Sequence, residues 1–93
     1  MIFEWDDKKS ISNKRKHGVS FEEAQTVFFD EKAIEFGDPD HSIQEERFFL
    51  LGLNQNLKVL VVCHCYRSQD SKIRILSARK ATKKEQGVYF RRS

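Results

Sequence analysis

One histidine and three arginines in the second half of the chain have the residue types for chemistry at a phosphate. They are His64, Arg67, Arg74 and Arg79. Histidine exchanges a proton near neutral pH, and the planar fork of donors in arginine binds phosphate oxygens. A reaction at a phosphodiester needs both an acid or base and cations for the charge on the phosphoryl oxygens. We therefore treat His64 as the candidate proton-transfer residue and the arginines as candidate phosphate ligands.

Three segments predict the strands that hold these side chains. Residues 47–53, 57–66 and 72–79 are rich in apolar and β-branched residues, and short polar turns separate them. Short connections indicate antiparallel hairpins, and the segment 57–66, apolar on both faces in its middle, is expected at the centre of the sheet. Residues 2–5 predict a further short strand, and residues 33–36 fit an edge strand inside an otherwise acidic loop.

Alternation of side chains along these strands predicts the geometry of the site. His64 and Tyr66 share one face. The residues expected on the opposite, core face are Val61, Cys63, Cys65, Ile73 and Ile75. With that pairing Arg74 emerges beside His64, while Arg67 and Arg79 border the same surface.

Helix boundaries are predicted from capping residues. An aspartate at position 6 or 7 begins a helix that runs to about residue 17, and Gly18 ends it. Ser20 with Glu23, and Thr82 with Glu85, form two capping boxes that open further helices. The second helix has one apolar face, made of Phe21, Ala24, Val27 and Phe28.

These elements predict one α+β domain over residues 1–93, in the order β-α-α-β-β-β-α, with helices segregated from an antiparallel sheet. No apolar run is long enough to span a membrane, and residues 1–7 lack the layout of a secretory signal, so we expect a cytoplasmic protein. Cys63 and Cys65 match no usual zinc spacing, and two buried thiols are the simpler interpretation.

The charge is distributed unevenly along the chain. Residues 8–16 carry five basic and no acidic residues, residues 22–46 carry nine acidic residues and one lysine, and residues 66–93 carry nine basic residues against two acidic ones. A basic cluster in a small protein is typical of a surface that binds a nucleic-acid backbone. Solvated helix faces are the alternative interpretation.

Motifs spread over nearly the whole chain resemble those of the BrnT toxins. They are residues 3–6, Asn13, residues 16–24, residues 45–48, Gly52, His64 with Tyr66 and Arg67, residues 73–82 and Glu85. Leu76 stands where the family usually has isoleucine, which is a conservative departure.

The resemblance implies a fold similar to the RelE toxins, with helices on one side of a curved antiparallel sheet. It also implies metal-independent cleavage of RNA, without a cofactor, and inhibition of translation and growth. The implied partner is a cognate antitoxin with a ribbon-helix-helix region. It would form a 2:2 heterotetramer with the toxin, and the toxin would reach DNA only through it.

In that reaction His64 would transfer the proton, with Arg67, Arg74 and Arg79 at the phosphate. Three lysines, Lys80, Lys83 and Lys84, would steer the RNA. Other candidates remain open: His17, the group Glu45, Glu46 and Arg47, and base stacking by Trp5 or Tyr89. The alternative function is that of a non-catalytic binding module, which binds RNA or the antitoxin and acts as a co-repressor.

Overall fold

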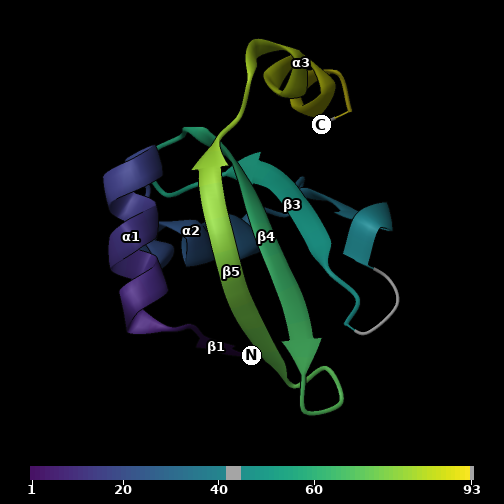
Figure 1. Cartoon of the computed structure of the whole chain (residues 1–93). Coiled ribbons are helices and arrows are strands. Elements are labelled where there is room, and N and C mark those ends of the chain that lie inside the picture. Colours follow the sequence, from purple (N-terminus) through teal and green to yellow (C-terminus); the bar gives the residue numbers. More distant parts are fainter. Residues whose placement is uncertain (42–44, 93) are drawn as a thin grey trace.

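A five-stranded sheet in the order β1-β5-β4-β3-β2 is the framework of the fold. The computed structural model describes residues 1–41 and 45–92 (Figure 1). Its strands are β1 (Ile2–Glu4), β2 (Ile34–Gly37), β3 (Phe48–Leu53), β4 (Val59–Arg67) and β5 (Lys72–Lys80). The predicted strand segments are confirmed to within two residues at each end, with β4 in the centre and β2 at an edge. Residues 42–44 of the predicted acidic loop lie outside the described residues.

The first helix, α1 (Asp7–His17), begins and ends as its capping residues predict. The Asp6 side chain accepts hydrogen bonds from the backbone N–H groups of Lys8 and Lys9. At the other end Gly18 adopts a φ of 74°, which glycine reaches without steric cost, and its N–H donates to the Lys14 carbonyl. Because its apolar content is low, α1 attaches to the rest of the protein through polar groups.

Asn13 makes most of that attachment. Its side-chain amide donates to the carbonyls of Val19 and Ala78, both at 2.8 Å, and its oxygen accepts from the Ala78 N–H at 3.1 Å. One buried amide thus joins α1, the loop after it and β5. Ile11, the one large apolar residue of this helix, is 62% exposed.

The two predicted capping boxes form to different degrees. Thr82 and Glu85 satisfy each other's backbone N–H groups at the start of α3 (Lys83–Arg92). In α2 (Phe21–Gln25), Ser20 Oγ accepts from the Glu23 N–H at 3.0 Å, but the Glu23 carboxylate accepts from Asn54 Nδ2 in the β3–β4 turn. This carboxylate therefore links α2 to the sheet. Two 3₁₀ turns, η1 (Thr26–Phe29) and η2 (Pro39–His41), complete the described elements.

Separate apolar clusters cover the two faces of the sheet. The larger cluster joins α2 and η1 to Leu60 and Val62 of β4, and Phe21, Ala24 and Val27 in it are completely buried. The smaller cluster joins Tyr89 of α3 to Val59 and Val61 on the opposite face of β4. Figure 1 agrees: α2 lies behind the sheet, whereas α3 lies at the end of β5.

The α+β class is confirmed, but two details of the prediction are wrong. The sheet is mixed, because β1 pairs with β5 in parallel. The helices do not all lie on one side, because α3 packs against the face opposite α2. The physical reason lies in β4, whose middle residues are apolar on both faces, so that each face must bury side chains. Among the described residues, no helix is long and apolar enough to cross a membrane.

Candidate active site

A β-bulge in β5 decides which side chains share a face. Cys63 pairs with Ser77 and His64 with Ile75, so Leu76 is an extra residue in the ladder. Ile75 therefore lies on the face of His64 and packs in the larger cluster, while Arg74 is paired with Cys65. The prediction that Arg74 emerges beside His64 is wrong, because regular alternation takes no account of an inserted residue.

The same bulge brings the three predicted arginines to one face. Arg74 pairs with Cys65 and Arg79 with Val61, and Arg67 follows Cys65 by two residues on β4. We call this surface, made of Arg67, Arg74, Arg79, Cys63, Cys65 and Ser77, the arginine face. Without the bulge, the odd separation of Arg74 and Arg79 would put their side chains on opposite faces. Figure 1 shows no helix in front of the middle of β4 and β5 on this side.

Each of these arginines is already paired with a carboxylate. Arg79 binds both oxygens of Glu85, at 2.7 and 2.8 Å, and this contact lowers the pKa of Glu85 to about 2. The Arg74 guanidinium donates to Glu4 at 2.9 Å. Arg67 is held most weakly, at 3.4 Å from Glu45. The distance between guanidinium nitrogen and carboxylate oxygen therefore increases from Arg79, through Arg74, to Arg67.

His64 lies on the other face and is completely buried. Its Nδ1 is 3.1 Å from the Val62 carbonyl oxygen, and its Nε2 is 3.0 Å from Glu35 Oε2. The Tyr66 hydroxyl donates to the same Glu35 oxygen. Aromatic rings enclose the imidazole, with those of Phe28 and Phe48 centred 4.8 and 6.0 Å away. His64 is thus connected to the surface through its hydrogen-bond partner Glu35, whose side chain is 37% exposed.

Sequence reasoning missed Glu35, which is 29 residues from His64 along the chain. In the sequence, Glu35 is marked only as a carboxylate inside a predicted edge strand. The pairing of β2 with β3, and of β3 with β4, brings Glu35 close to His64. We call Glu35, His64 and Tyr66 the proton cluster. Burial and, to a smaller extent, the hydrogen bond to Glu35 raise the pKa of Tyr66, so this residue remains a phenol at neutral pH.

An open cavity of about 640 Å³ gives access to this cluster. Its lining consists of Met1, Glu35, Glu45, Glu46, Phe48, Tyr66 and Asp70. Glu45 lines the cavity and is also the partner of Arg67 on the arginine face. Arg67 and Glu45 therefore lie between the cavity of the proton cluster and the arginine face, at the end of the sheet where β4 leads into its turn.

The remaining predicted residues occupy several places. Lys80, Lys83 and Lys84 are exposed at the end of β5 and the start of α3, next to Arg79. Tyr89 is only 2% exposed, and its hydroxyl donates to Asp30 at 2.6 Å, so base stacking by this ring is excluded in this conformation. Trp5 packs edge-to-face against Phe21, which agrees with a core role. Both cysteines are free and buried.

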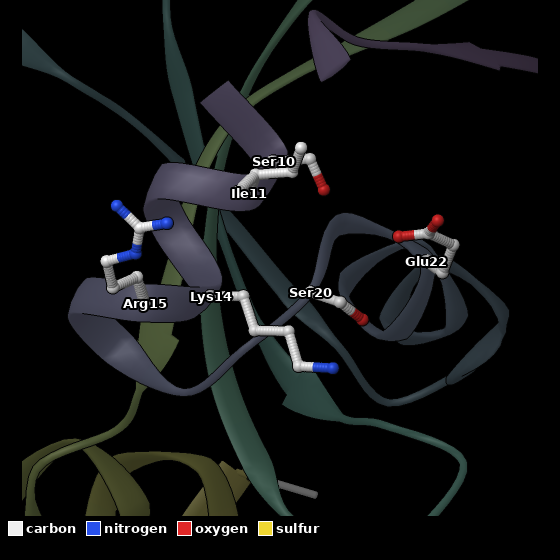
Figure 2. A pocket seen from close by; sticks show the side chains of 6 residues that line it. All are labelled: Ser10, Ile11, Lys14, Arg15, Ser20 and Glu22. Atoms are coloured by element: carbon white, nitrogen blue, oxygen red, sulfur yellow. The ribbon is translucent and has the colours of Figure 1, made fainter. Parts of the chain in front are cut away.

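A second hollow lies between α1 and the start of α2, in the predicted basic segment. It measures about 600 Å³ and is lined by Ser10, Ile11, Lys14, Arg15, Ser20 and Glu22. In Figure 2, Lys14 extends towards Ser20, whereas Arg15 points to the other side of α1. None of the six lining residues is a histidine or tyrosine, so this hollow offers cations but a poorer set of proton-transfer groups. Within the described residues, no three His, Cys, Asp or Glu side chains are grouped to hold a metal ion.

The fold and these groups define a small α+β protein with arginines on one face of its sheet and, on the other, a buried histidine that contacts an exposed glutamate. A family model described as the ribonuclease toxin BrnT of type II toxin–antitoxin systems matches residues 5–85. The chain therefore belongs to the BrnT family of ribonuclease toxins.

Comparison with solved structures agrees on the fold. The crystal structure of the Brucella abortus ribonuclease toxin BrnT superimposes with a TM-score of 0.68 at 20% sequence identity. The match covers 89% of this chain and 100% of the Brucella chain. A search of curated proteins gave no match.

Proposed function

We propose that this chain is a toxin that cleaves RNA in the cytoplasm without a metal ion and thereby inhibits translation and growth. Family membership supports the ribonuclease role. The observation that carries the mechanism is the junction at the end of β4, where Glu45 contacts Arg67 on one side and lines the cavity of the proton cluster on the other. Phosphate ligands and proton-transfer groups are thus within reach of a single RNA strand.

In this mechanism the ribose 2′-hydroxyl attacks the adjacent phosphorus, and the bond from phosphorus to the 5′-oxygen breaks. Arg67, which lies at this junction, binds the phosphate oxygens as charge builds on them, and its fork suits that geometry. Arg74 and Arg79 lie further along the arginine face and bind neighbouring phosphates of the same strand. His64 serves proton transfer from its buried position, through its contact with Glu35. Exposed Lys80, Lys83 and Lys84 extend the cationic surface and steer the RNA.

We further propose that a cognate antitoxin silences this site. Membership in a type II toxin–antitoxin family supports such a partner. An acidic or amphipathic antitoxin segment would complement the arginine face and displace Glu4 or Glu45 from its arginine. A ribbon-helix-helix region in the antitoxin would dimerise, giving a 2:2 complex that reaches DNA only through the antitoxin.

The test is cleavage of labelled RNA by the purified protein in the presence of EDTA. We expect products with 2′,3′-cyclic phosphate ends, and losses of about 10- to 100-fold in the Arg67→Ala and Arg74→Ala variants. Lys32→Ala is the matched control, because Lys32 is an exposed cation in the acidic segment, outside the basic segments of the chain. If His64→Ala, with its fold verified by circular dichroism, cleaves at the wild-type rate, the role of His64 is wrong.

One observation favours the rival function, a non-catalytic co-repressor. All three arginines are paired with carboxylates of the same chain. Such pairing is expected for a surface that exchanges these carboxylates for those of a binding partner and performs no chemistry. On that interpretation the wild-type protein binds RNA or antitoxin but leaves the RNA intact, with and without ribosomes. Cleavage that the antitoxin suppresses would exclude it.

A further inference from the structure

The hydrogen-bond partners of His64 determine where its protons lie. A backbone carbonyl oxygen only accepts hydrogen bonds, and the Val62 carbonyl faces Nδ1 at 3.1 Å. Nδ1 must therefore carry a proton, because two lone pairs would otherwise oppose each other inside the protein. The neutral form of His64 with this proton has only a lone pair left on Nε2.

The contact at Nε2 then requires a second proton. Nε2 is 3.0 Å from Glu35 Oε2, and a lone pair on Nε2 cannot bond to an ionised carboxylate oxygen. The pair thus holds one proton more than a neutral histidine and a carboxylate together. Because Tyr66 also donates to Oε2, this oxygen is best satisfied as an acceptor of two bonds. That arrangement places the second proton on Nε2, shared with Glu35.

The described surroundings of the pair are aromatic on the His64 side and ionisable on the Glu35 side. Phe28 and Phe48 enclose the imidazole and keep water from it. The other residues with ionisable groups that line the cavity around Glu35 are Met1, through its N-terminal amine, Glu45, Glu46, Asp70 and Tyr66. Glu45, Glu46 and Asp70 are acidic like Glu35, whereas the Met1 amine is basic. Tyr66 is the donor that orients Glu35.

We propose that Glu35 is the general acid of RNA cleavage, and that buried His64 is a positioning residue that shares its proton with Glu35. This inference rests on the proposed ribonuclease function and assigns a direction to its proton transfer. Glu35 is the only member of the pair with exposed surface, so it is the group that contacts the RNA.

Bond formation and bond cleavage are each coupled to the transfer of one proton. The 2′-oxygen forms its bond to phosphorus and releases its proton to solvent water. The bond from phosphorus to the 5′-oxygen breaks, and that oxygen takes the proton of the pair through Glu35. Neutral His64 and ionised Glu35 remain, and they regain one proton from solvent before the next turnover.

Nitrogen NMR of the ¹⁵N-histidine-labelled chain tests the proton count without reference to activity. We expect Nδ1 of His64 to be protonated at neutral pH, with Nε2 carrying or sharing a second proton. His17 and His41 provide reference signals within the same sample. A neutral His64 with its single proton on Nε2 would overturn the inference. Tyr66→Phe should alter the His64 signals, because it removes one donor from Glu35.

A substrate with sulfur in place of the bridging 5′-oxygen tests the role of Glu35 as an acid. A thiolate leaves without protonation, so this substrate does not need the acid. We expect Glu35→Gln to lower cleavage of ordinary RNA by about 100-fold or more and to cleave the sulfur substrate at the wild-type rate. His64→Asn should show the same rescue, and Glu31→Gln, an exposed carboxylate nearby in the chain, should cleave both substrates normally.

The outcomes separate the failure of this inference from the failure of the proposed function. An equal loss of Glu35→Gln on both substrates shows that Glu35 does not act as the acid, although the protein remains a ribonuclease. If the wild-type protein cleaves neither substrate, with or without ribosomes, the proposed function fails and the catalytic assignment of Glu35 fails with it. The NMR result then still decides whether His64 and Glu35 share a proton.

Discussion

The two faces of the sheet bury their side chains to different extents. The face towards α1 and α2 holds the larger cluster, in which Phe21, Ala24, Val27 and Val62 are completely buried. The arginine face has only α3 at one end, and it presents exposed Ser77 and three partly exposed guanidinium groups. One face therefore resembles a protein interior and the other a charged surface.

This difference indicates that one face of the sheet mainly stabilises the fold, whereas the other is available for binding. Apolar packing on the helix-covered face supplies most of the favourable burial and fixes β4 and β5. The arginine face buries only the smaller cluster, and its guanidinium groups are partly exposed, so they are available to exchange one partner for another. The proton cluster lies at the border: its histidine belongs to the covered face, while its glutamate faces the cavity.

The largest expected effect comes from removing one aromatic ring on each face. Phe21→Ala should lower the free energy of unfolding by about 3–5 kcal/mol, because Phe21 is completely buried in the larger cluster. Phe49→Ala, on the opposite face, should lower the free energy of unfolding by about 1–2 kcal/mol, because Phe49 is only partly buried against the smaller cluster. Urea denaturation measures both. Equal losses would contradict the difference between the two faces.

A smaller effect is expected at the polar link between α1 and the sheet. Asn13→Ala should lower the free energy of unfolding by about 2–4 kcal/mol, because it leaves the buried backbone groups of Val19 and Ala78 without their partner. Ser12→Ala, on the exposed side of the same helix, should change it by less than about 0.5 kcal/mol. If Asn13→Ala has as little effect as Ser12→Ala, α1 is held mainly by other contacts.

Asn13 also illustrates which parts of the fold the sequence could predict. The ends of α1, the start of α3 and the central place of β4 were predicted, because caps and apolar patterns are local signals. The polar attachment of α1 could not be derived in this way, since its partners include Ala78, 65 residues further along the chain. Local patterns also failed to predict that α3 covers the second face of the sheet.

The candidate site was predicted in its residue types but not in its geometry. Arginine and histidine were recognisable from their chemistry, and the three arginines do share a face. Because of the bulge at Leu76, Arg74 lies on the face opposite His64. The alternation of side chains along a strand does not reveal such an inserted residue. Glu35 was missed because its contact with His64 exists only once β2 has joined the sheet.

The smallest expected effect is the pH dependence of the ion pair that fastens α3 to the arginine face. Arg79 lowers the pKa of Glu85 from 4.5 to about 2, so the folded state holds this carboxylate ionised more strongly than the unfolded chain does. The stabilisation is therefore complete above about pH 4.5 and is lost as the pH falls towards 2. Both side chains are partly exposed, 42% and 30%, so we expect a stabilisation of about 1 kcal/mol, well below the value implied by the full pKa shift.

Glu85→Gln tests this pH dependence. It keeps one acceptor oxygen for the Thr82 N–H and removes the charge together with the second acceptor that Arg79 binds. It should be about 1 kcal/mol less stable than the wild type in urea at pH 7 and equally stable near pH 2, whereas exposed Glu31→Gln should follow the wild type throughout. A constant difference between wild type and Glu85→Gln at all pH values would show that this contact stabilises α3 through its geometry and not through its charge.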